Sequence, residues 1–213
     1  FSDWNTPNIT LNHGDIDANY FQHQPFLDNA LKETDFKLKA LGIGSGTHVG
    51  LYSKKYKSID DVADGARVVI PNDPVNQGRA LLLLQQSKLI TLKDANNHLS
   101  NLQDIASNPK NLKFIEVEGP QTARAVDEAD LVFSYPMYLR LAKTIDPNAA
   151  LVLDQINNTR YAILFVVRDD YEQTHPEKAE NLKKFIQIYQ NSEKVKQELN
   201  ADIGEKLWFK GWK

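Results

Sequence analysis

The chain has 213 residues, of which 41% are hydrophobic and 25% are charged, and its formal net charge at pH 7 is −3. This is the composition of a globular protein, and the slightly negative charge argues against nucleic-acid or anionic-membrane partners, which usually need a basic patch. The absence of cysteine excludes disulfides, thiolate zinc sites and a cysteine nucleophile. No segment approaches the roughly 20 apolar residues of a membrane-spanning helix.

Short β-rich runs alternate with amphipathic runs along the chain, which is the pattern of an α/β fold. Ser58 and Asp61 have the spacing of a capping box and predict the start of a helical turn. The segment 96–109 is polar and is expected to be a loop with one short turn. Strands are expected at 36–43, 48–56, 66–70, 112–117, 130–134, 150–153 and 161–168.

The segment from Asp73 onward predicts a helix to about Ser87, because Asp is a favoured N-cap and Pro74 a favoured first helical residue. Its four consecutive leucines, residues 81–84, cover every side of a helix and predict that it is buried all round. Further helices are expected at 121–129, 136–143, 176–190 and 192–199. The third of these places Ala179, Leu182, Phe185, Ile186 and Tyr189 on one face.

Catalytic signatures are missing from the sequence. It contains no nucleophile elbow, Walker loop, dinucleotide fingerprint or zinc-protease motif, so we expect neither an enzyme nor a cofactor. The glycine-rich run Gly42 to Gly46 follows a strand and is expected to be a loop or hinge rather than a phosphate site. The five histidines are scattered and none has i, i+4 spacing, so no metal site is predicted.

Two segments carry denser information. Residues 15–26 combine polar and aromatic side chains at an expected strand-to-helix turn, and either feed the core or form a ligand wall. Residues 71–79 place Asn76 and Arg79 one helical turn apart near a helix N-terminus, where backbone N–H groups favour an anion and an Arg fork matches a carboxylate. The alternative for Arg79 is a pairing with an aspartate of the chain.

Strings in these two segments and elsewhere along nearly the whole chain resemble the methionine-binding lipoprotein family, the NlpA-type substrate-binding proteins of methionine uptake transporters. They are FSDW, GDIDANYFQHQPFL, LYSKKYKSIDD, VVIPNDPVNQGRALLLLQ and NPKNLKFIEVE, in this order. The resemblance implies a two-lobed periplasmic-binding-protein fold with hinge crossing strands and a ligand cleft. The lobes would be 1–48 with 166–213, and 49–165, with crossing strands near 49–52 and 163–166. The family's first strand and helix are expected to be missing from this sequence.

The resemblance also implies partners and a location. They are a small amino-acid ligand, the permease of an ABC transporter, and the membrane through a lipid anchor upstream of Phe1, outside the cytoplasmic membrane. The predicted function is capture of L-methionine or a related amino acid for delivery to the permease. The alternatives are a binding protein for another carboxylate-bearing ligand, such as a dipeptide, and a surface interaction lipoprotein that no longer serves transport.

The ligand-binding residues follow from the same resemblance. Phe21 and His23 match the family's wall around the apolar part of the ligand, and Arg79, with Asn76 beside it, matches the arginine that binds the carboxylate. An aromatic contact is expected from Trp4, where the family commonly has Tyr. Two positions depart from the pattern, since Ser134 and Ile163 align where the family usually carries Asn. Residues expected to compensate or to join the pocket are Tyr135, Tyr138 and His48.

Overall fold

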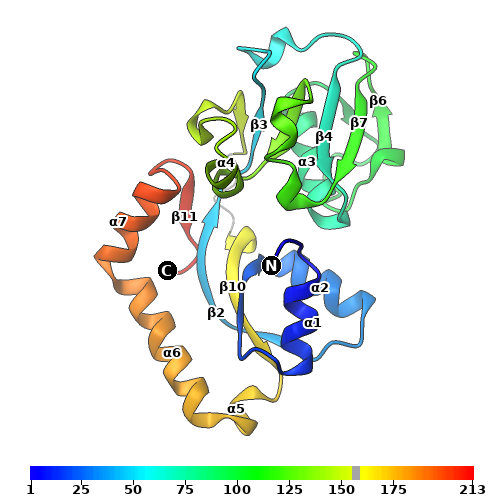
Figure 1. The fold of residues 1–213 in the computed structure, drawn as a ribbon. Coiled ribbons are helices and arrows are strands. Elements are labelled where there is room, and N and C mark those ends of the chain that lie inside the picture. The colour runs from blue at the N-terminus through cyan, green and yellow to red at the C-terminus, as the bar shows by residue number, and fades with distance from the viewer. Residues whose placement is uncertain (155–158) are drawn as a thin grey trace. The chain divides into compact units, whose positions relative to one another are not determined.

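A computed structural model describes residues 1–154 and 159–213, and the chain divides into two compact units. Unit 1 comprises Phe1–Thr47 and Asn157–Lys213, and unit 2 comprises His48–Ile156. Each unit has a sheet of its own with helices packed against it (Figure 1). The expected α/β class is therefore confirmed. No helix in the described ranges is long and apolar enough to cross a membrane.

The sheet of unit 1 has four strands in the order β1-β10-β2-β11, all antiparallel. These strands are β1 (Asn19–His23), β10 (Ala162–Arg168), β2 (Leu38–Thr47) and β11 (Trp208–Lys210). The helices of unit 1 are α1 (Thr6–His13), α2 (Gln24–Glu33), α5 (Tyr171–Thr174), α6 (Pro176–Asn191) and α7 (Glu193–Asp202), with a 3-10 turn η6 at Thr159–Tyr161.

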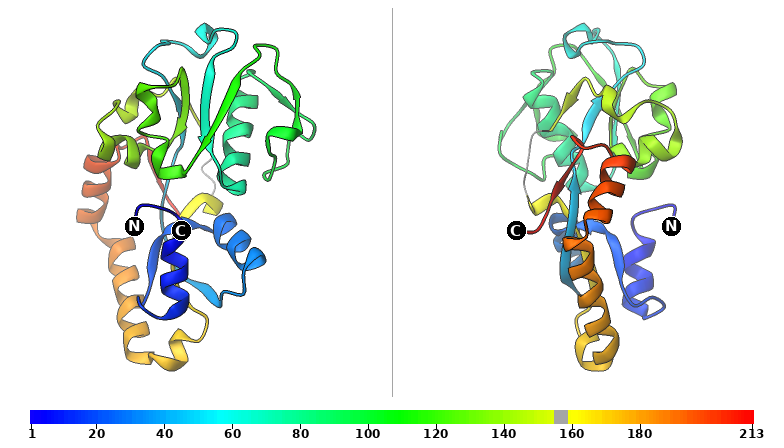
Figure 2. Two further views of the ribbon diagram at one scale, coloured as in Figure 1. Left: turned by 45° about the vertical axis from the view of Figure 1, so that its right-hand side comes forward. Right: turned by 90° about the vertical axis from the view of Figure 1, so that its left-hand side faces the viewer.

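Alternation along β10 explains how helices cover both faces of this sheet. Leu164 and Val166 point to the side of α1 and α2, where they form a buried cluster with Leu11 and Leu27. Phe165 and Val167 point to the opposite side, where α6 lies alongside β2 and β10 (Figure 2). Because successive strand residues face opposite ways, a continuous apolar run is what a strand covered on both faces requires.

The glycines of β2 let large side chains lie directly on the strand backbone. A Cβ at Gly42, Gly44 or Gly46 would come within 2.9 Å of Ile186, 2.2 Å of Tyr20 and 2.2 Å of Phe209, respectively. The three glycines stand at every second position of β2, so they share one face of the strand. The expectation of a loop or hinge at 42–46 is therefore wrong, because the missing side chains serve close packing within a strand.

The sheet of unit 2 has five strands in the order β7-β4-β8-β3-β9. The first three of these are parallel to one another. β3 pairs antiparallel with β8, and β9 pairs antiparallel with β3. The strands are β3 (Gly50–Tyr52), β4 (Arg67–Pro71), β7 (Lys113–Val117), β8 (Leu131–Ser134) and β9 (Val152–Leu153), beside a separate pair β5 (Thr91–Leu92) and β6 (Ile105–Ser107).

Unit 2 has two α-helices among its described residues, α3 (Pro74–Gln86) and α4 (Pro136–Ala142). Asp73 caps α3, Pro74 is its first residue and the four leucines are buried, as the sequence predicts. The capping box of Ser58 and Asp61 also forms, although on a 3-10 turn. The expected helix at 121–129 is wrong. The 3-10 turns are η1 (Ile59–Asp61), η2 (Leu102–Asp104), η3 (Gly119–Gln121), η4 (Ala125–Asp127) and η5 (Pro147–Ala149).

The second boundary between the units differs from the one expected near residue 165. The chain returns to unit 1 at residue 157, so all of β10 belongs to unit 1. Pairing explains the difference, because β10 pairs with β2 from Ala162 to Arg168 and with β1 from Ile163 to Val166. Residues 155–158, which fall in the expected second lobe, lie outside the described residues.

Candidate functional site

Arg79 is buried in unit 2 and forms an ion pair with Asp154. It projects from the second turn of α3, and Nε and Nη2 donate to Asp154 Oδ2 at 2.9 and 2.5 Å. The two side chains are only 4% and 2% exposed. A buried charge of either kind is costly unless it is paired, so each residue holds the other in place.

Asp154, near the end of unit 2, is held by the backbone of Val49, near the start of the unit. Its Oδ1 accepts the N–H of Val49 at 3.0 Å, and its own N–H donates to the carbonyl of Val49 at 2.9 Å. His48 Nδ1 lies 3.3 Å from the same Oδ1. Arg79 is thereby connected to the residues at both ends of unit 2, His48 and Val49 at its start and Asp154 near its end.

The charge of Asp154 is maintained despite its burial. Burial alone would raise the pKa of this carboxyl group, but the Arg79 guanidinium and hydrogen bonds from His48, Arg79 and the Val49 N–H together lower the pKa below its ordinary value. The pair is therefore ionic, with the negative charge on Asp154 neutralising the positive charge on Arg79.

Asn76 belongs to the N-terminal cap of α3. The carboxylate of Asp73 accepts the backbone N–H of Asn76 at 2.9 Å and its side-chain amide at 3.0 and 3.2 Å. Burial raises the pKa of Asp73 in spite of these hydrogen bonds. Asn76 thus lies on the same helix as Arg79, one turn before it, as the spacing predicts.

Ser134 and Tyr135 lie at the end of β8 and the start of α4. Ser134 is fully buried, with its Oγ 2.9 Å from Thr122 Oγ1. Tyr135 is 8% exposed, and its ring contacts those of Phe133 and Tyr138 edge to face. Burial raises the pKa of the Tyr135 phenol well above its ordinary value, so it stays protonated. Tyr135 adds an aromatic surface in the neighbourhood of Asp73 and Arg79, whose charges act on this phenol.

The predicted aromatic residues of unit 1 form one group around Phe26. The ring of Phe26 lies 6.1 Å from Trp4, 5.8 Å from Phe21 and 6.4 Å from His23, in edge-to-face arrangements. His23 also contacts the ring of Tyr161 at 5.2 Å. The sequence-predicted residues Trp4, Phe21 and His23 are therefore gathered in one place.

His23 has a structural role at the junction of β1 and α2. It is the N-cap of α2, and its Nδ1 accepts the N–H of Phe26 at 3.3 Å. An accepting Nδ1 leaves Nε2 as the nitrogen that carries the proton. The strand-to-helix turn predicted for 15–26 is confirmed, since β1 ends at His23 and His23 is the N-cap of α2.

Three buried amides fix α1 against β1. The side chains of Asn8 and Gln22 form a reciprocal pair, with Asn8 Nδ2 donating to Gln22 Oε1 at 2.9 Å and Gln22 Nε2 donating to Asn8 Oδ1 at 2.6 Å. Asn19 donates to Asn8 Oδ1 at 2.9 Å and to the carbonyl of Pro7 at 3.2 Å. Because buried amides need such partners, the cluster holds β1, and with it Phe21 and His23, in register with α1.

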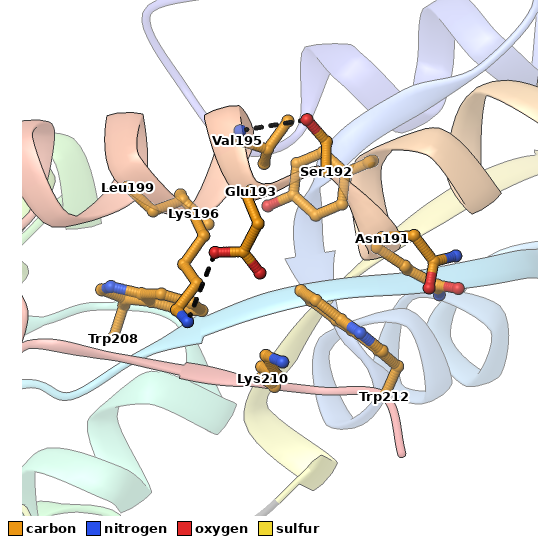
Figure 3. A pocket seen from close by; sticks show the side chains of 11 residues that line it. Asn191, Ser192, Glu193, Val195, Lys196, Leu199, Trp208, Lys210 and Trp212 are labelled. Atoms are coloured by element: carbon orange, nitrogen blue, oxygen red, sulfur yellow. Dashed lines mark hydrogen bonds and ion pairs between the residues drawn. The ribbon is translucent and has the colours of Figure 1, made fainter.

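A shallow hollow lies between α7 and β11 and is lined by Trp208, Trp212, Lys196 and Glu193 among others (Figure 3). Several of its polar groups have partners in the chain: Trp208 Nε1 donates to Asn200 at 2.7 Å, and Lys196 lies 3.6 Å from Glu193. This arrangement is that of a packing seam. Within the described ranges, no group of three or more His, Asp or Glu side chains could hold a metal ion.

Asp154 is the residue that sequence reasoning missed. The sequence showed that an inward-pointing Arg79 needs a partner, but not which of the chain's aspartates would supply it. The position of Asp154 directly after the short β9 was the available signal, because polar residues at strand ends often meet at one edge of a sheet.

The fold is that of a periplasmic substrate-binding protein. A structure of this class, the ABC transporter periplasmic substrate-binding protein from Coxiella burnetii, is 34% identical, with a TM-score of 0.85 over 97% of this chain and 84% of the other. The crystal structure of the methionine binding protein MetQ is 40% identical, with a TM-score of 0.89 over 100% of this chain and 84% of the other.

The sequence comparisons identify the family. Residues 1–211 match the model of the NlpA lipoprotein family. The D-methionine-binding lipoprotein MetQ of Escherichia coli strain K12 is 43% identical over 196 residues, which are 91% of this chain and 70% of the relative. The chain belongs to the NlpA lipoprotein family, as the strings in its sequence indicate.

Proposed function

We propose that this chain is the extracytoplasmic substrate-binding component of an ABC importer and that its ligand is methionine or a closely related amino acid. The observation that carries this proposal is the 43% identity to a D-methionine-binding lipoprotein over nearly the whole chain. The similar structures are likewise described as binding proteins. The chain therefore acts by binding and delivery to a permease rather than by catalysis.

Arg79 is the carboxylate-binding residue in this proposal. A guanidinium has five N–H donors in a rigid plane, and this geometry matches a carboxylate. Asp154 binds Arg79 on its Nε side. The N-terminus of α3, with Asn76, adds favourable N–H dipoles for an anion. His48, Ser134 and Tyr135 are the further unit 2 residues assigned to the site.

Trp4, Phe21 and His23 are the residues proposed to contact the apolar part of the ligand. Their rings are held by Phe26 and Tyr161, so they form a preorganised apolar surface. A thioether side chain suits such a surface, because sulfur makes favourable contacts with aromatic rings. Membership of a lipoprotein family supports the further proposal that a lipid anchor keeps the protein at the membrane surface, outside the cytoplasm.

Calorimetry with L-methionine, D-methionine and the other amino acids tests the function. We expect methionine to bind well below millimolar concentrations and most other amino acids to bind at least about tenfold more weakly. Failure of every amino acid to bind at millimolar concentration would refute the proposal.

The variant Arg79→Lys tests the assignment of the carboxylate site. Lysine keeps the charge that Asp154 needs but loses the planar fork, so we expect the dissociation constant for methionine to rise by about tenfold or more. Arg67→Lys is the matched control, because Arg67 is also paired with an aspartate of unit 2, Asp130, but is largely exposed. Equal affinities of the Arg79→Lys variant and the unaltered chain would contradict this role.

A further inference from the structure

The partner of Arg79 determines the net charge that a ligand carboxylate meets. We propose that Asp154 makes the site selective for zwitterionic amino acids over plain carboxylic acids, because it neutralises Arg79 in place. This inference rests on the proposed function, in which Arg79 binds the ligand carboxylate.

Geometry shows that Asp154 is a permanent part of the site. Its Oδ2 accepts two hydrogen bonds from Arg79, and its Oδ1 accepts the Val49 N–H with His48 Nδ1 also in range. A carboxylate offers about four acceptor positions, and all of them are directed at these partners. With 2% of its side chain exposed, Asp154 has no solvent to turn toward. A ligand must therefore bind in its presence.

The other titratable groups around Arg79 do not change this charge balance. Asp73 caps the N-terminus of α3, where backbone N–H groups compensate a negative charge. The phenol of Tyr135 is protonated, since burial raises its pKa. His48 points at Asp154 rather than at Arg79 in the contacts that the structure describes. Among these described groups the dominant charges are therefore one guanidinium and one carboxylate, which cancel.

A neutral pair treats an anion and a zwitterion differently. Two oxygens that bind different edges of one guanidinium lie about 6 Å apart, and at an effective dielectric of about 20 their carboxylates repel by an energy equivalent to about a hundredfold in affinity. An amino acid carries an ammonium group close to its carboxylate. Asp154 attracts this ammonium and compensates its repulsion by Arg79, which offsets the repulsion between the two carboxylates. A carboxylic acid without an amino group has no such compensation.

The test compares methionine with desamino-methionine, the analogue that lacks only the amino group. Calorimetry is run at low salt and at pH 8, where histidine side chains are ordinarily neutral. We expect the unaltered chain to bind methionine more tightly than the analogue, by up to about a hundredfold. In the Asp154→Asn variant the pair becomes cationic, and we expect this ratio to fall by at least about tenfold, whatever happens to the absolute affinities.

Two further variants separate charge from structure. Asp154→Glu keeps the negative charge and should keep the preference for methionine. Asp130→Asn removes an aspartate that pairs with Arg67 in the same unit, and should leave the ratio unchanged. A loss of binding caused by general disruption would weaken both ligands equally and would not move the ratio.

The outcomes separate a failure of the role of Asp154 from a failure of the proposed methionine-binding function. An unchanged ratio in Asp154→Asn, or equal binding of the two ligands by the unaltered chain, would overturn the role of Asp154 and leave methionine binding standing. The measurement on the unaltered chain decides the matter even where Asp154→Asn does not fold. Absence of methionine binding by the unaltered chain would refute the function itself, and with it this inference.

Discussion

Replacing Gly44 by alanine should destabilise unit 1 strongly for so small a change. The added Cβ would lie 2.2 Å from Tyr20 Oη and 2.7 Å from two carbons of its ring. Tyr20 has little room to retreat, because its ring stacks on Phe165 at 4.2 Å and its hydroxyl lies 3.0 Å from Tyr189 Oη. Overpacking costs about 1–3 kcal/mol and each lost hydrogen bond about 1 kcal/mol, so we expect a loss of about 2–4 kcal/mol.

The assay is urea unfolding followed by tryptophan fluorescence. It reports on the correct unit, because all three tryptophans, Trp4, Trp208 and Trp212, belong to unit 1. In a Tyr20→Ala background the clash is absent, and Gly44→Ala should then cost less than about 1 kcal/mol. If the substitution costs the same in both backgrounds, or less than about 1 kcal/mol in the unaltered chain, the packing argument is wrong.

Two other predictions concern charged groups. Asp154→Ala leaves Arg79 buried without its counter-charge and should cost about 3–5 kcal/mol of unit 2 stability, whereas Arg79→Met combined with Asp154→Leu should cost less. Thermal unfolding compares the two, and a larger loss in the double variant would contradict the reasoning. Glu172 is bonded to Lys183 and Lys39, which lower its pKa from 4.5 to about 2. Its stabilising contribution is complete above pH 4.5 and is lost as the pH falls through about 2. In the Glu172→Gln variant the free energy of unfolding should fall less steeply as the pH is lowered through this range. An unchanged pH dependence would exclude the ion pairs of Glu172 as its cause.

Local chemistry explains why much of unit 2 could be predicted from sequence. Asp73, Pro74 and the leucines of α3 act through neighbours in the chain, so capping rules and helical periodicity suffice to place them. The helix predicted at 121–129 does not form, because a tertiary contact is involved there. The segment holds the last residue of η3 and all of η4, and the buried Thr122 contacts Ser134, which lies on β8.

Long-range pairing explains what could not be predicted. The glycine-rich pattern of β2 does not predict a strand, because the residues that need the space, Tyr20, Ile186 and Phe209, are distant in sequence. The partnership of Arg79 and Asp154 likewise joins residues far apart in the chain. Sequence identified the need for a partner through the buried leucines around Arg79, but only the fold selects one aspartate among many.

The division of the chain into units also has a consequence for the order of folding during synthesis. Unit 2 is one uninterrupted segment, His48 to Ile156, so all of its strands are available as soon as it emerges from the ribosome. Unit 1 is different, because β2 ends at Thr47 while its two neighbours, β10 and β11, follow only after residue 161. Non-local pairing of this kind is slow and leaves strand edges exposed. The pairing of β1 and β2 with β10 must therefore wait until Ala162–Arg168 have been synthesised.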